Sequence, residues 1–199
     1  DQHSFLAASG AMRSLAVKLS KIASDLILLA SGPRAGLGEI NLPPVQPGSS
    51  IMPGKVNPVM PELLNLVSFR VIGNDVSVVL AARNGQLQLN AYEPLEAIAV
   101  LDSQRLLANT MSTVRSKCID GITVNADTLA GYIERTVGIV TALNPVIGYD
   151  RATELAKEAY STNKGILEIV REKKVLTEEQ IKEILNPAAL TGLDKKQYQ

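Results

Sequence analysis

Three long segments of this 199-residue sequence repeat apolar residues at alternating spacings of three and four. A repeat of about 3.5 residues keeps one stripe of an α-helix facing a partner helix. The first stripe consists of Phe5, Ala8, Met12, Leu15, Leu19, Ile22, Leu26 and Leu29. Gly32-Pro33 follows it, and glycine before proline is typical of a helix end. The sequence therefore predicts long helices that pack side by side.

The same spacing predicts a second helix over residues 59–83 and a third that begins near Glu93. The second stripe consists of Met60, Leu64, Val67, Val71, Asn74, Val78 and Ala81. The third consists of Val100, Gln104, Leu107, Met111, Val114 and Cys118. Asn74 is a polar member of its stripe, and we expect it to form a hydrogen bond that sets the register of two helices. Each helix would be about 40 Å long, which predicts an elongated bundle shared between subunits.

From residue 125 onward the patterns predict shorter helices. These are expected at residues 127–136, at 150–160 with Asp150 as the cap, at 166–173, and after a capping box of Thr177 and Gln180. The predicted fold is all-α. Residues 1–122 form part of a long-helix bundle, and residues 123–199 form a small helical C-terminal domain whose last residues, 194–199, are expected to fray.

Charge and composition exclude several classes of protein. Twenty basic and twenty acidic residues cancel, which argues against a nucleic-acid partner. No apolar run approaches the ~18 residues of a membrane span, so no membrane association is expected. The single cysteine, Cys118, lies on an apolar stripe and fits packing in a reducing, cytoplasmic compartment. Because the chain begins at Asp1 and is helical by Phe5, we expect it to be a fragment of a longer protein.

A loop at about residues 35–61 separates the first two helices. Six of the ten prolines lie in it, which excludes a helix or a central strand. Ile51, Met52 and Val56 are expected to anchor it, so an ordered or closing loop is favoured over a linker. Its one cation, Lys55, lies among glycines, hydroxyls and an amide, a set that can bind a carboxylate. A solvated loop explains the same composition equally well.

The order of residues in this loop is more informative than its composition. Residues 48–58 read Gly-Ser-Ser-Ile-Met-Pro-Gly-Lys-Val-Asn-Pro. This segment resembles the signature loop G-S-S-x-M-P-x-K-x-N of the fumarase/aspartase superfamily, and every fixed position is matched. Residues 31–43 (SGPRAGLGEINLP), 71–75 (VIGND) and 143–145 (LNP) also look like these enzymes. The resemblance therefore covers the whole chain.

The resemblance implies roles for four residues of the loop. Ser49 matches the catalytic base, and Ser50 matches a position that helps to hold the carboxylate beside the departing proton. Lys55 and Asn57 match residues that bind the other carboxylate of the substrate. The implied reaction is an anti elimination from a four-carbon dicarboxylate, with no metal or organic cofactor. The implied assembly is a homotetramer in which each active site draws on three subunits.

Other site segments of the superfamily, including a Thr-His pair, lie upstream of the part that this chain matches. The only histidine, His3, matches none of the family's site positions and is expected to be a surface or packing residue. We therefore expect the chain by itself to be inactive.

Two stretches favour one branch of the family. Residues 86–90 (QLQLN) and 58–62 (PVMPE) look like aspartases, which predicts elimination of ammonia from L-aspartate to give fumarate. Residues 147–150 (IGYD) look like fumarases, so a fumarate hydratase is the alternative. A non-catalytic helical assembly module is an alternative of another class for the isolated chain, and it would give Ser49 and Lys55 no special role.

Overall fold

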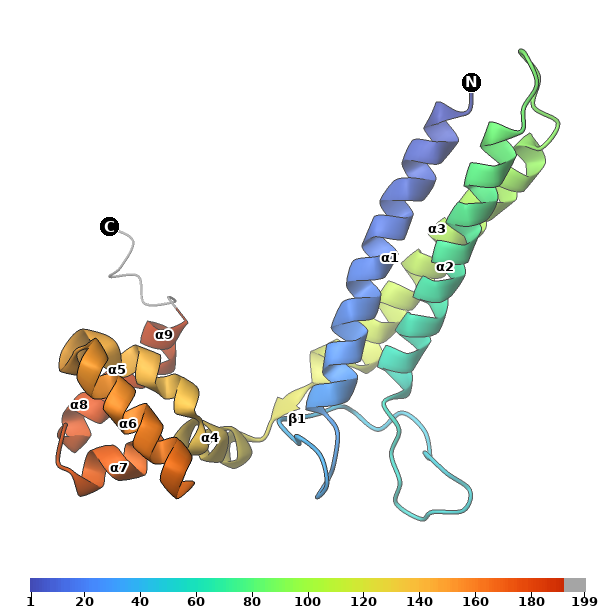
Figure 1. Ribbon diagram of the computed structural model, residues 1–199. Helices are drawn as coiled ribbons and strands as arrows, with labels where there is room; N and C mark the ends of the chain where they lie inside the picture. Colours follow the sequence, from blue (N-terminus) through green and yellow to red (C-terminus); the bar gives the residue numbers. More distant parts are fainter. Residues whose placement is uncertain (192–199) are drawn as a thin grey trace. The chain divides into compact units, whose positions relative to one another are not determined.

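The computed structural model describes residues 1–191, and the chain divides into two compact units (Figure 1). The first unit comprises residues 1–125, and the second begins at Ala126. The described residues are mainly helical, which confirms the all-α prediction. The expected fraying of residues 194–199 lies outside the described residues.

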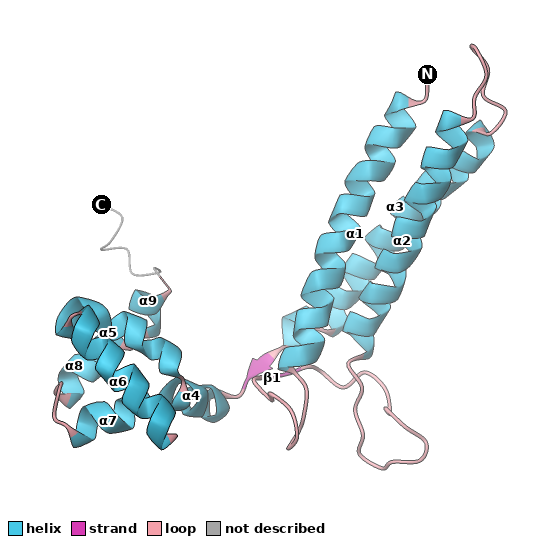
Figure 2. Ribbon diagram, in the orientation of Figure 1, coloured by secondary structure: helices cyan, strands magenta, loops and turns pink. Residues whose placement is uncertain are grey.

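Three long helices make up most of the first unit. They are α1 (His3–Leu29), α2 (Val59–Arg83) and α3 (Glu93–Lys117). Each runs antiparallel to the one before it (Figure 2). As a result, the loop between α1 and α2 and the turn between α2 and α3 lie at opposite ends of the unit.

A short ribbon ties the end of the first unit to the start of the loop. After the 3₁₀ turn η1 (Ile119–Gly121), strand β2 (Thr123–Val124) pairs antiparallel with β1 (Ile40–Asn41). The side chain of Asn125 adds a hydrogen bond from Nδ2 to the Gly38 carbonyl, at 2.7 Å. Strands of two residues are too short to show an alternating pattern, so the sequence analysis missed them.

The stripe predicted for α2 is the core of the first unit. Leu64, Val67, Val71, Asn74, Val78 and Ala81 are all buried, and Met60 is partly buried. Asn74 donates from Nδ2 to Ser103 Oγ on α3 at 3.0 Å, so its predicted hydrogen bond between helices is confirmed. Because α2 packs against both α1 and α3, its stripe is covered from two sides.

The stripes predicted for α1 and α3 are partly wrong. On α1 the buried residues are Ser9, Ala16 and Ala23, whereas the predicted Leu15 and Ile22 are exposed. Small side chains at a contact allow two helix axes to approach closely, and the larger apolar side chains then face outward.

On α3 the difference has the same cause. Ser103 and Thr110 are buried, whereas Gln104 and Met111 are exposed. Ser103 donates to the Ala99 carbonyl at 2.7 Å while it accepts from α2, so this polar residue is buried with its hydrogen bonds formed.

Cys118 ends the α3 stripe and is buried, as predicted. Removal from water raises the pKa of its thiol, because burial disfavours the thiolate. The residue therefore has a packing role.

By length and composition, α2 is the one helix among residues 1–191 that is long and apolar enough to cross a membrane. The sequence analysis expected no such segment. A buried helix in the core of a bundle meets the same criterion. The polar Asn74 and Asp75 of α2 are buried and paired with side chains of α3 and α1, as a core helix requires.

A buried carboxylate joins α1 to α2. Asp75 accepts from Ser9 Oγ at 2.7 Å and pairs with Arg13 Nη1 at 3.1 Å, and only 5% of its side chain is exposed. We expect Asp75→Ala to lower the free energy of unfolding by about 2–3 kcal/mol, because it leaves the buried Ser9 hydroxyl without its acceptor. Asp75→Asn keeps one oxygen acceptor and should cost about 1 kcal/mol. Urea denaturation at fixed protein concentration measures both.

The matched control for this prediction is Lys21→Gln, which removes an exposed ion pair with Asp25 on α1. Such surface pairs contribute little, so its effect should stay within about 0.5 kcal/mol. Equal effects of Asp75→Ala and Lys21→Gln would contradict the prediction.

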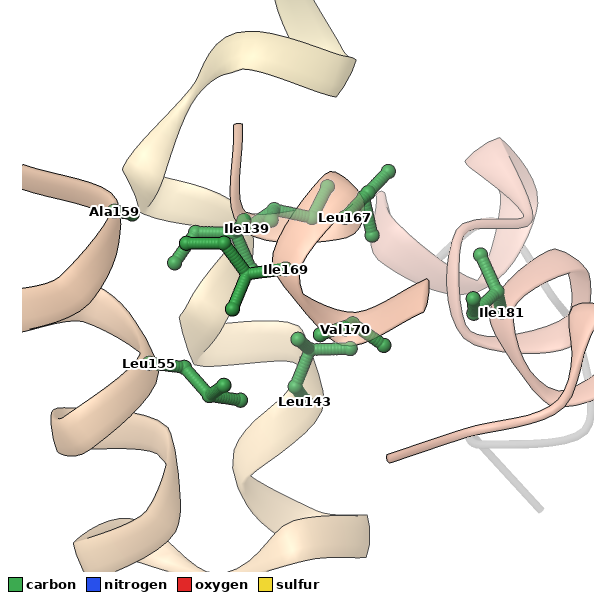
Figure 3. Packing of buried hydrophobic residues seen from close by; sticks show 9 residues of the cluster. Ile139, Leu143, Leu155, Ala159, Leu167, Ile169, Val170 and Ile181 are labelled. Atoms are coloured by element: carbon green, nitrogen blue, oxygen red, sulfur yellow. The ribbon is translucent and has the colours of Figure 1, made fainter. Parts of the chain in front are cut away.

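The second unit consists of shorter helices. They are α4 (Ala126–Arg135), η2 (Val137–Ile139), α5 (Val140–Ile147), α6 (Tyr149–Thr162), α7 (Ile166–Glu172), α8 (Glu178–Ile184) and α9 (Pro187–Leu190). Figure 3 shows their shared core, in which Leu143, Leu155, Ile169 and Val170 converge.

Two predictions about helix starts in this unit had opposite outcomes. The capping box of Thr177 and Gln180 is confirmed, with both of its hydrogen bonds present. The cap predicted at Asp150 is wrong, because Gly148 precedes α6 and Asp150 lies in its first turn. The sequence analysis also missed α5, whose interior Pro145 interrupts the usual helical signal.

Candidate active site

The loop that carries the signature joins β1 to α2. Its last predicted residues, 59–61, belong to the first turn of α2, where Pro61 is tolerated because the first turn lacks partners for its N–H groups. The loop proper therefore covers residues 42–58. Its path below the helices is visible in Figure 2.

Residues 48–57 close on themselves. The Gly48 N–H donates to the Lys55 carbonyl at 2.8 Å. The Asn57 side chain donates from Nδ2 to the Gly48 carbonyl at 2.9 Å. We call these two hydrogen bonds the loop neck.

A turn reverses the chain inside this closed segment. The Lys55 N–H donates to the Met52 carbonyl at 3.3 Å, and Gly54 has a φ of 79°. This backbone region favours glycine, which explains why this chain carries glycine at a position that the signature leaves open. The turn returns Lys55 toward Gly48 and thereby allows the neck to form.

Ser49, the predicted catalytic base, lies directly after the neck. Its Oγ accepts hydrogen bonds from the backbone N–H groups of Ile51 and Met52, both at 3.1 Å. Two donors aimed at this oxygen would stabilise an alkoxide more than the neutral hydroxyl, since hydrogen bonds to a charged acceptor are the stronger ones. The local fold thus supplies part of the support that a serine base needs.

The other predicted site residues lie on the same closed segment. Ser50 and Lys55 are exposed and Asn57 is half-buried. In the part of the chain that the structure describes, Lys55 has no carboxylate partner and Ser50 has no hydrogen bond through its side chain. The ammonium of Lys55 and the hydroxyl of Ser50 are therefore available to a ligand.

The prediction that apolar side chains anchor the loop is wrong. Ile51, Met52 and Val56 are 86%, 52% and 54% exposed. Backbone hydrogen bonds at the neck and turn hold the segment instead. The apolar side chains of the loop are left facing outward.

Sequence reasoning missed two contributors to this site. The sequence analysis gave Gly48 no part in closing the loop, although an added Cβ at this position would lie 2.5 Å from the Lys55 carbonyl oxygen. The N–H groups of Ile51 and Met52 also went unnoticed. Serine often accepts from N–H groups two or three residues ahead, so the position of Ser49 in the loop was a usable signal.

His3 and residues 86–90, which the sequence analysis also considered, lie away from the loop. His3 is exposed at the start of α1, at the opposite end of the unit. The stretch 86–90 forms the turn between α2 and α3, where Gln86 and Leu89 exchange backbone hydrogen bonds of 2.9 and 3.0 Å. Because α2 has 25 residues and spans about 37 Å, one chain does not bring this turn to Ser49.

Comparisons with known proteins identify the family of this chain. A family model described as a lyase matches residues 1–73, and one described as the C-terminus of fumarase C matches residues 139–192. Aspartate ammonia-lyases from Pseudomonas aeruginosa, Helicobacter pylori and Escherichia coli are 55%, 54% and 49% identical to this chain over 94%, 92% and 94% of its length. The chain belongs to the fumarase/aspartase superfamily.

Solved structures of the superfamily share this fold. A fumarate lyase:delta crystallin from Brucella melitensis in native form matches 94% of this chain with a TM-score of 0.85 and 51% identity. A class II fumarase from Schistosoma mansoni matches 93% of it with a TM-score of 0.83 and 37% identity. The present chain covers 42% of the length of the Brucella protein and 39% of the length of the Schistosoma fumarase. It spans 40%, 39% and 39% of the three ammonia-lyases.

Proposed function

We propose that the complete protein is an aspartate ammonia-lyase, which eliminates ammonia from L-aspartate to give fumarate. The observation that carries the elimination chemistry is the loop of residues 48–57, where the Ser49 Oγ accepts two backbone N–H groups. The choice of aspartate as the substrate is supported by the relatives named aspartate ammonia-lyase, at 49–55% identity.

In the proposed mechanism Ser49 removes the proton from the carbon next to a carboxylate. Negative charge then develops on that carboxylate, and stabilising it is the main energetic task. Ser50 helps to hold this carboxylate, while Lys55 and Asn57 bind the other one. A cation and an amide suit this role because charge-assisted hydrogen bonds to carboxylates are stronger than neutral ones.

Closure of the loop over the substrate would complete the site. Lys55 and Ser50 are exposed to solvent in this structure, and the high dielectric constant of water weakens Coulomb attraction there. Moving the closed segment onto bound substrate excludes water and strengthens every such contact. The exposed Ile51, Met52 and Val56 would then bury apolar surface as the loop docks, which favours the closed state.

The complete protein is proposed to be a homotetramer with active sites shared between subunits. The first unit leaves large apolar side chains exposed on all three helices, among them Ile22, Phe69 and Ile98. Such surface on long helices is typical of an association interface. A cytoplasmic location is part of the proposal and accords with the unpaired Cys118.

Substrate choice is the test of this proposal. Purified complete enzyme is given L-aspartate or L-malate, and fumarate is followed by its absorbance. We expect kcat/KM to favour aspartate by about 10³-fold or more, because a site built to hydrogen-bond an ammonium leaves acceptors unpaired when a hydroxyl replaces it. A higher kcat/KM for malate would replace the aspartase assignment by a fumarase.

The fumarase alternative rests on residues 147–150 and on the 37% identity to the class II fumarase. Ser49, Lys55 and Asn57 handle a proton and a carboxylate, which malate and aspartate both possess. The proposed roles of these residues therefore hold under either assignment.

A further inference from the structure

The loop neck connects two residues that the proposed function treats separately. Asn57 is assigned to a substrate carboxylate and Ser49 to the proton. In the structure the Asn57 amide donates to the Gly48 carbonyl at 2.9 Å. This carbonyl is part of the peptide bond between Gly48 and Ser49. The position of Asn57 therefore constrains the backbone that carries Ser49.

The Asn57 amide has enough hydrogen-bonding groups for both contacts. Its NH₂ group has two N–H donors, and only one can point at the Gly48 carbonyl. The other N–H remains for a ligand oxygen. A carboxylate held there would be linked through one side chain to the peptide group in front of Ser49.

Gly48 is required for this arrangement on steric grounds. A Cβ at this position would lie 2.5 Å from the Lys55 carbonyl oxygen and 2.9 Å from the Asn57 backbone nitrogen. Both neighbours are backbone atoms and cannot move aside as a flexible side chain would. Any larger residue must therefore open the neck.

We propose that the Asn57 side chain couples carboxylate binding to the placement of Ser49 through its hydrogen bond to the Gly48 carbonyl. Gly48 is then a positioning residue, because its N–H and C=O groups close the neck. The proposal rests on the roles of Ser49 and Asn57 in the proposed function. It adds that the closed segment of residues 48–57 holds its shape before substrate arrives and moves as one piece.

The first test measures the neck without reference to activity. Trypsin is added to the complete enzyme, and the fragment that begins at Val56, after cleavage at the exposed Lys55, is quantified by mass spectrometry. Gly48→Ala and Asn57→Asp should each raise the cleavage rate about tenfold, because cleavage follows the population of opened loop. Asp keeps the shape of Asn but, when ionised, donates no hydrogen bond. Gln46→Ala, at an exposed loop position outside the closed segment of residues 48–57, is the control and should be cleaved at the wild-type rate.

The second test measures the coupling. Fumarate should slow tryptic cleavage of the wild-type loop and fail to slow it in Asn57→Asp. In a double-mutant cycle, Gly48→Ala and Asn57→Asp should lower kcat/KM by no more together than the more severe variant alone. Gly48→Ala should act mainly on kcat, since it misplaces Ser49 but removes no group that binds substrate.

The outcomes separate this inference from the proposed function. Wild-type cleavage rates in both neck variants would contradict the claim that the neck keeps the loop closed. Additive losses of kcat/KM would contradict the coupling between carboxylate binding and the placement of Ser49. Both conclusions would hold even if aspartate were the substrate. A failure of the wild-type enzyme to act on aspartate would contradict the proposed function. The tryptic cleavage rates would still test whether the neck keeps the loop closed.

Discussion

Replacing Ser49 by alanine in the complete enzyme is expected to lower kcat by about 10³-fold or more, because it removes the group proposed to accept the proton. Binding of aspartate and assembly of subunits should stay near the wild-type level. Ser49 lies on a loop outside the helix contacts, and water can satisfy the Ile51 and Met52 N–H groups in place of its Oγ. Steady-state kinetics give kcat, and calorimetry gives binding.

The control for the Ser49 variant is Ser14→Ala, which removes an equally small hydroxyl from the exposed surface of α1. This variant should keep the wild-type rate. Retention of most of the rate by Ser49→Ala would remove Ser49 from the mechanism. Loss of assembly together with activity would instead point to a structural defect.

Placing a charge on the apolar face of α2 is expected to dissociate the assembly and abolish turnover. Phe69 is 58% exposed in the single chain, and Leu66 lies one turn before it, also exposed. If this face is buried between subunits, Phe69→Glu forces an unpaired carboxylate into an apolar contact, which is strongly unfavourable. Because the active sites are proposed to be shared, activity should be lost with assembly. Analytical ultracentrifugation and the fumarate assay measure the two effects.

The control for Phe69→Glu is Lys182→Glu on α8. Lys182 is exposed and belongs to the second unit, outside the three long helices whose apolar faces are proposed to associate. Its charge reversal should leave assembly intact.

The exposed apolar face of α2 also predicts that the 199-residue chain by itself associates at micromolar concentration. We expect this chain by itself not to convert aspartate. A stable, compact monomer would contradict the shared-bundle proposal.

The candidate site was partly predictable from sequence. Ser49, Ser50, Lys55 and Asn57 were selected from the order of residues in one short loop, and the structure places all four in the closed segment 48–57. Their proposed roles await the experiments above. The neck was not predictable in the same way, because it depends on which backbone groups meet when the chain turns at Gly54.

The sequence by itself determined the three long helices of this protein, and only the tertiary structure decided which of their faces touch. Helix extent follows from local spacing and from glycine and proline at the ends, so α2 was predicted at its observed bounds. Burial depends on the partner. Leu15 and Ala16 fit equally well into a local pattern, but α1 approaches α2 through Ala16 and leaves Leu15 exposed. Close approach favours small residues, and which small residues face a neighbouring helix is a property of the packed pair, which no single helix encodes.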